Sequence, residues 1–218
     1  MRDLASPAVL KRAVLAACGS SVACFPRLRT HDRYPLWYLG AVIFLGSIML
    51  WGFVFAWHTK YMKQPVFKKL ELRPWTVATL MGLAGAALLR ASLDPALRPA
   101  IPSDYPRDFE QWISMTLFSL AFTQLFLIFA PIAWLARLSN NRQFAIVSTI
   151  LFGVFVLLIK ERASPMRLPP LLFAELATVR FLNGILSVFL YLRGGVGLVL
   201  WWTLLLQSRH LWLGIDFG

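Results

Sequence analysis

The stretch YPLWYLGAVIFLGSIMLWGFVFAWHT, residues 34–59, decides the fold class of this chain. It contains no Asp, Glu, Lys or Arg, and aromatic residues lie near both of its ends. A helix rises about 1.5 Å per residue and the hydrocarbon core of a bilayer is about 30 Å thick, so roughly 20 apolar residues cross it. Tyr and Trp side chains favour the membrane–water interface. The stretch therefore predicts a membrane-spanning α-helix.

Similar apolar runs recur along the rest of the chain. The further runs that we expect to span are residues 74–90, 111–136, 143–160, 168–192 and 194–213. The chain of 218 residues is 58% hydrophobic and only 15% charged, whereas a soluble domain carries about 25% charged residues. The sequence predicts an all-α fold, a polytopic transmembrane helix bundle with about six spans.

The N-terminal segment, residues 1–33, differs from the rest of the chain. It is basic, and its apolar stretch between Arg12 and Cys18 is shorter than the core of about 7–15 residues that a signal peptide needs. We expect an interfacial amphipathic helix here, from about Pro7 to Cys24, followed by a single transmembrane helical domain over residues 34–218. If the N-terminal helix also inserts, the chain gains one more span.

The formal net charge of +12 predicts contact with a membrane surface rather than with nucleic acid. Basic residues lie between the apolar runs, where Lys and Arg meet anionic lipid headgroups. No zinc-finger, RRM or helix-turn-helix pattern occurs in the sequence. The densest basic connection predicts an amphipathic elbow on those headgroups, and its basic residues are Lys60, Lys63, Lys68, Lys69 and Arg73. We expect an integral protein of the bacterial cytoplasmic (inner) membrane.

Ionisable residues inside an apolar run mark a candidate functional site, since a charge at the centre of a spanning helix costs about 2.5–3.5 kcal/mol. Glu175 and Arg180 lie inside run 168–192, and Asn183 follows on the face of Arg180. These residues predict either a functional polar pocket or a structural polar cluster between helices. Glu175 also lies close enough to Pro170 for its carboxylate to reach the membrane surface.

The histidines offer little hydrolytic or metal chemistry. His31, His58 and His210 all lie at segment edges, outside the apolar cores. None of them forms a pair with metal-ligand spacing, so we expect no metal site. No motif in the sequence indicates a particular cofactor.

Two short motifs lie in the C-terminal half, Ala130-Pro131-Ile132-Ala133 and the turn Tyr191-Leu192-Arg193-Gly194-Gly195. On these residues the stretch 118–211 resembles the CPBP family of CAAX proteases and bacteriocin-processing (Abi-like) relatives. That family carries two glutamates after the first motif and histidines on later helices. The residues at those positions here are Trp134, Leu135, Val156 and either Trp202 or Thr203. The resemblance therefore implies an intramembrane-protease scaffold with degenerate catalytic motifs.

These observations support three functional hypotheses. The leading one is a non-catalytic CPBP-like membrane protein that acts as a scaffold, accessory subunit or binding module of a membrane complex with a protein partner. The first alternative is an intramembrane protease using Glu175, which predicts that His58 or His210 folds back toward that carboxylate. The second is a small transporter or a lipid- or pigment-binding protein, which predicts a cavity beside Glu175, Arg180 and Asn183.

Overall fold

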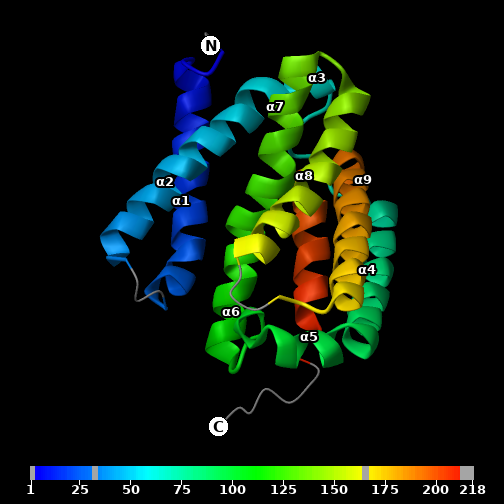
Figure 1. The fold of residues 1–218 in the computed structure, drawn as a ribbon. Coiled ribbons are helices and arrows are strands. Elements are labelled where there is room, and N and C mark those ends of the chain that lie inside the picture. The colour runs from blue at the N-terminus through cyan, green and yellow to red at the C-terminus, as the bar shows by residue number, and fades with distance from the viewer. Residues whose placement is uncertain (1–2, 31–33, 164–166, 212–218) are drawn as a thin grey trace.

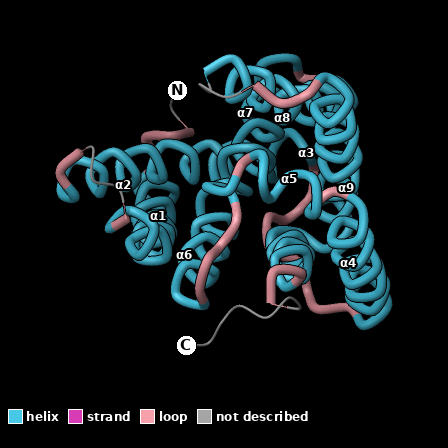
Figure 2. Tube along the Cα trace, turned by 60° about the horizontal axis from the view of Figure 1, so that its bottom comes forward, coloured by secondary structure: helices cyan, strands magenta, loops and turns pink. Residues whose placement is uncertain are grey.

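The computed structural model describes residues 3–30, 34–163 and 167–211. This part of the chain is a helical bundle, 85% helical and without strands (Figure 1). Seen from its lower end, the bundle has α1 and α2 on one side and α4 with α9 on the other (Figure 2). Within the described ranges, six helical segments are long and apolar enough to cross a membrane. The predicted all-α transmembrane bundle is therefore confirmed.

The six segments alternate with short connections. The first three are α1 (Pro7–Arg29), α2 (Leu36–Phe53) continued through a π-helical turn (Val54–His58) into α3 (Thr59–Met62), and α4 (Leu72–Ser92). The short α5 (Asp94–Ala100) and a 3-10 turn (Pro102–Asp104) follow at one end of the bundle. The last three are α6 (Phe109–Phe118) joined to α7 (Ala130–Ser139) through two π-helical turns (Ser119–Thr123 and Leu125–Phe129), α8 (Arg142–Ala163) and α9 (Pro170–Ser208).

The N-terminal helix α1 extends beyond the expected Pro7–Cys24 and also meets the alternative that it inserts. It is itself long and apolar enough to span, and it packs against α2 and α6. Its buried residues form one stripe at three- and four-residue intervals, as for a helix packed lengthwise on neighbours. They are Ala13, Ala17, Ser20, Cys24 and Leu28. Lys11 and Arg12 interrupt the apolar run in the sequence, but they lie near the helix start, where long basic side chains reach water.

Helix α9 consists of two arms that reverse direction at Gly195, whose φ of 70° and ψ of −162° are not helical. The indole N–H of Trp202 donates to the side-chain oxygen of Asn183 at 3.0 Å. In a straight helix these residues, 19 positions apart, would lie about 28 Å from each other. The second arm therefore folds back along the first (Figure 1). This confirms the break predicted between the last two apolar runs.

The return arm of α9, residues 196–208, is about 20 Å long at 1.5 Å per residue. That is shorter than the hydrocarbon core of about 30 Å and shorter than the predicted span 194–213. Residues 212 and 213 of that span lie outside the described residues. The arm occupies the centre of the bundle (red in Figure 1), and its buried residues are Val196, Leu198, Val199, Trp202, Thr203 and Leu205. It is an interior helix rather than a lipid-facing span.

The connection from α3 to α4, where an amphipathic elbow on lipid headgroups is predicted, has an extended backbone. Lys63 has a left-handed backbone (φ 54°) that ends α3, and Phe67 forms an isolated antiparallel bridge with Gly195. The ammonium of Lys68 donates to the Leu192 carbonyl at 2.6 Å, where the end of a helix favours positive charge. Lys68 thus caps the first arm of α9. The other basic residues of the cluster are exposed: Lys60, Lys63, Lys69 and Arg73.

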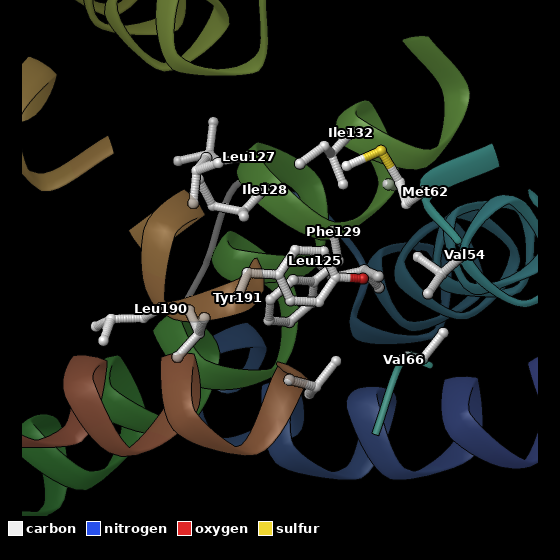
Figure 3. Packing of buried hydrophobic residues seen from close by; sticks show 14 of the residues in the cluster. Val54, Met62, Val66, Leu125, Leu127, Ile128, Phe129, Ile132, Leu190 and Tyr191 are labelled. Carbon is white, nitrogen blue, oxygen red and sulfur yellow. The ribbon is translucent and has the colours of Figure 1, made fainter. Parts of the chain in front are cut away.

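Side chains from four parts of the chain meet in the core (Figure 3). Tyr191, near the end of the first α9 arm, packs on Phe129 with ring centroids 4.9 Å apart. Val54 and Met62 join the same cluster from the α2–α3 segment, and Val66 joins it from the extended connection. Burying a side chain of this size contributes about 1.5–3 kcal/mol, so this cluster anchors the connection beside the turn of α9.

Candidate functional site

Glu175, Arg180 and Asn183 have different surroundings on the first arm of α9. Glu175 is exposed and Arg180 is half-buried, and the described residues offer no hydrogen bond or ion pair between them. Asn183 accepts the hydrogen bond from Trp202 that holds the two arms of α9 together. Two cavities of the described part, of about 670 and 410 Å³, are lined by other residues. The three residues therefore occupy separate positions on the first arm.

The residues at the CPBP-like positions have no acid–base chemistry. Trp134 and Leu135 lie on α7, and Val156 lies half-buried on α8. Thr203 is buried in the return arm, and its hydroxyl donates to the Val199 carbonyl at 2.9 Å. General acid–base catalysis needs a side chain that takes up or releases a proton near neutral pH. None of these side chains does so.

An apolar groove of about 410 Å³ lies where α2, the continuous helical segment from α6 to α7, and α8 meet. Its lining residues are Leu50, Phe53, Phe126, Ala130, Pro131, Trp134, Leu135, Ser148, Leu151, Phe152 and Phe155. The Ser148 hydroxyl and the Trp134 indole are the only polar side-chain groups in this lining. The groove therefore suits a hydrocarbon chain and offers almost nothing to a charged or strongly polar molecule.

His58 lies in the core, which corrects the expectation that it stays at a segment edge. It ends the π-helical turn after α2 and is only 1% exposed. Its Nδ1 lies 3.1 Å from the buried Tyr191 hydroxyl. Buried polar groups are stable when hydrogen-bonded, and this contact gives His58 Nδ1 and the Tyr191 hydroxyl one partner each. Sequence reasoning missed it, because the π-helical turn that directs His58 inward has no signal in the sequence.

A buried ion pair lies at the end of the bundle where α4, α5 and the end of α9 meet. The guanidinium Nε of Arg209 lies 3.1 Å from Asp94 Oδ2, with side chains only 18% and 10% exposed. The Tyr105 hydroxyl donates to Asp94 Oδ1 at 2.9 Å, and Arg209 Nη1 donates to the Leu206 carbonyl at 2.7 Å. Two donors thus satisfy the Asp94 carboxylate, as a buried charge requires.

A cavity of about 670 Å³ opens beside this ion pair. Its lining residues are Ala87, Arg90, Ala91, Asp94, Pro95, Arg98, Pro99, Tyr105, Pro106 and His210. The ring of His210 packs edge-on against Tyr105, with centroids 5.4 Å apart. Burial, together with the positive charges of Arg209, Arg98 and Arg90, lowers the pKa of His210 to about 3. The imidazole is therefore neutral near pH 7, and the charge in the cavity comes from the arginines.

The same surroundings change the pKa of the Tyr105 hydroxyl. Burial and the Asp94 carboxylate raise the pKa of Tyr105 above its ordinary value, so the hydroxyl stays protonated and donates. Among the described residues, no three His, Cys, Asp or Glu side chains lie together in a way that would hold a metal ion. The arrangement can bind through guanidinium groups and has no group placed as a nucleophile or a general base.

Sequence reasoning missed this cavity. Asp94 and Tyr105 lie in a Pro-rich connection that composition marks only as an ordered loop, and Arg209 lies over a hundred residues further on. One signal was present: Arg90, Asp94 and Arg98 recur at four-residue intervals, which places charged side chains on one face of a helix.

Comparisons with models of protein families, with curated proteins and with solved structures found no match to this chain. Its class is therefore defined by the fold and composition alone. The protein is an integral membrane protein of the helical-bundle class.

Proposed function

We propose that this protein is a non-catalytic, CPBP-like component of the bacterial inner membrane that acts as a scaffold, accessory subunit or binding module of a membrane complex. The observation that carries the proposal is the identity of the residues at the positions that the resemblance assigns to catalysis. Trp134, Leu135 and Val156 have no ionisable group, and the Thr203 hydroxyl is bonded within its own helix. What remains is a set of packed helices with open cavities, among them those of about 670 and 410 Å³, which suits binding.

The geometry weighs against the protease alternative. A protease centred on Glu175 needs an imidazole near its carboxylate to share protons. Glu175 is exposed, while His58 is bonded to Tyr191 in the core and His210 packs on Tyr105 beside the Asp94 cavity. The two histidines are thus engaged with other partners, and the described part of the chain supplies no acid–base pair around Glu175.

The apolar groove favours a second candidate function, the binding of a lipid acyl chain. The groove lies on spanning helices, and Leu151 and Phe155 on its α8 side are more than half exposed on the outer face. In a membrane such a face meets hydrocarbon, so the nearest occupant is an acyl chain of the bilayer. A binding module of this kind holds a lipid and leaves its covalent bonds unchanged.

Gentle detergent extraction followed by identification of co-purifying molecules tests the proposal. We expect a stoichiometric membrane-protein partner, and no cleavage when the purified protein is incubated with peptide substrates. A Glu175→Gln variant is the control for the protease alternative. Peptide cleavage that is lost in this variant would overturn the proposal.

A further inference from the structure

The cavity beside the Asp94–Arg209 pair has an unbalanced charge. Its lining includes one acid, Asp94, and two arginines, Arg90 and Arg98. The carboxylate of Asp94 is already neutralised by Arg209 at 3.1 Å and receives a further hydrogen bond from Tyr105. The positive charges of Arg90 and Arg98 are therefore not compensated by an acid of the lining. A cavity with such an excess attracts anions.

One nitrogen of the Arg90 guanidinium lacks a partner in the described part of the chain. Its Nη1 atom is buried and has no hydrogen-bond acceptor among the residues that the structure describes. A buried donor without an acceptor carries a full desolvation cost, so native structures nearly always satisfy it with protein, water or a ligand. Arg98 is exposed at the same cavity and forms no hydrogen bond or ion pair in the described ranges. Both guanidiniums are thus free to receive an external acceptor.

The two arginines reach one cavity because α4 and α5 present a common face. Leu93, between the two helices, keeps a helical backbone (φ −90°, ψ −41°), so the three- and four-residue spacing continues across the junction. Residues 87, 90, 91, 94, 95, 98 and 99 all line the cavity at this spacing. Guanidinium groups placed this way bind planar or tetrahedral oxyanions through paired N–H donors.

The position of the cavity indicates what kind of molecule carries the anionic group. Arg90 lies in the last turn of α4, where a spanning helix leaves the hydrocarbon and meets lipid headgroups. Alanine and proline side chains form much of the remaining wall, as at Ala87, Ala91 and Pro95. A wall of this kind accepts the apolar part of a molecule whose anionic group meets the arginines.

We propose that Arg90 and Arg98 form a binding site for a phosphate group carried on a larger molecule, either the headgroup of an anionic phospholipid or a soluble phosphate ester. This inference goes beyond the proposed function and does not depend on it. His210 supports the site as a neutral hydrogen-bonding group at the cavity wall, because it carries no competing charge near pH 7.

Two probes distinguish the sources of the phosphate. Native mass spectrometry of the full chain measures retention of phosphatidylglycerol against phosphatidylcholine, and titration calorimetry in detergent measures binding of glycerol 3-phosphate. A lipid site retains phosphatidylglycerol selectively and binds the soluble ester weakly. A site for a soluble ester binds glycerol 3-phosphate and shows no lipid preference. Either pattern supports the proposal if it depends on the two arginines.

The variants R98Q, R90Q and R90Q/R98Q test that dependence. We expect R98Q to weaken binding of the preferred probe about tenfold or more, and the double variant to abolish it, because each removes a charge-assisted hydrogen bond. R98K should retain part of the binding. R73Q is the matched control, since Arg73 is also exposed and lies at the opposite end of α4.

Arg98 is exposed, so R98Q should fold even if R90Q does not, and elution as a single helical species checks this. The proposal is overturned if R98Q binds both probes as the wild-type chain does. It is also overturned if R73Q loses as much affinity as R98Q, because binding would then follow net charge rather than a site. Failure of the wild-type protein to bind either probe would overturn it as well.

Discussion

Gly195 permits the reversal of α9. Its φ of 70° lies in the region that residues with a Cβ atom rarely adopt, and a Cβ built there would lie 2.5 Å from the Val66 carbonyl oxygen. The backbone N–H of Val196 donates to that same oxygen at 3.1 Å. The glycine therefore allows both the turn and the close approach of the extended connection.

We expect Gly195→Ala to destabilise the protein by about 2 kcal/mol or more, through backbone strain and the clash with Val66. Thermal unfolding in detergent, followed by circular dichroism, measures the effect. Gly153→Ala is the control, because Gly153 is helical and a Cβ added there would meet no atom within 4 Å; its substitution should be neutral or slightly stabilising. Equal unfolding temperatures for the two variants would contradict the role of Gly195.

The Asp94–Arg209 pair should carry much of the stability at its end of the bundle. Asp94→Asn leaves Arg209 buried without its counter-charge, which typically costs about 3–5 kcal/mol. Lys60→Met removes the exposed pair with Asp3, whose side chains are 58% and 43% exposed, and should change the stability far less, because water screens such a pair. Urea unfolding of both variants in the same detergent makes the comparison. Similar losses of unfolding free energy in the two variants would show that burial of the Asp94–Arg209 pair does not increase its contribution to stability.

His210 makes the folding stability of the protein depend on pH, and the direction of this dependence follows from its lowered pKa. Its folded pKa is lowered to about 3 by burial and by Arg209, Arg98 and Arg90, whereas an unfolded histidine titrates near 6.5. Between these values the unfolded chain binds a proton that the folded chain does not, so stability falls as pH drops from about 6.5 toward 3. The unfolding temperature of His210→Gln should therefore fall less steeply over this window. Parallel curves for variant and wild type would contradict the assignment.

Single elements were predictable where an uninterrupted apolar run exceeded the bilayer thickness. The run 34–59 corresponds to α2 with α3, and the break at Gly194-Gly195 falls where α9 reverses. The extended connection was not predictable from its own residues, because its conformation depends on the Val66 and Phe67 contacts with the turn of α9. The length of α1 was underestimated, because Lys11 and Arg12 hide an apolar run that continues beyond them, whereas its interfacial placement stays a prediction.

Cys18 tests whether α1 crosses the membrane. It lies midway along the helix and is exposed, whereas Cys24 is buried. If α1 spans, Cys18 faces the hydrocarbon, and a membrane-impermeant maleimide should not label it in intact membranes. A cysteine placed at the helix end, Thr30→Cys in a Cys18→Ala background, should react readily and serves as the positive control. Rapid labelling of Cys18 would indicate that α1 lies at the membrane interface and does not cross the bilayer.

The candidate cavity belongs to the whole molecule rather than to any one segment. Arg90, Tyr105 and His210 come from three stretches of the chain that meet only when the end of α9 reaches α5. Hydropathy predicts how many helices form, but it does not say which helix ends meet, since in lipid every apolar face is equally satisfied. The polar site predicted from Glu175, Arg180 and Asn183 therefore contained residues of one helix only, because the sequence does not show which other helices lie beside it.

The path of the described chain fixes where the start of α1 and the end of α9 lie. The start of α1 and the end of α9 are at opposite ends of the bundle (Figure 1). The ion pair of Asp3 with Lys60 holds the first end beside α3, and that of Arg209 with Asp94 holds the last end beside α5. If α1 crosses, the described chain passes along the bundle seven times, because the two arms of α9 run in opposite directions and count as separate passes.

The sidedness of the two termini tests this arrangement most directly. Reporter fusions that are active on only one face of the membrane, placed at the N-terminus and at the C-terminus of the full chain, make the measurement. We predict that the two termini report opposite faces. Reports from the same face would contradict the arrangement, because either α1 or the return arm of α9 would then fail to pass from one side of the bundle to the other.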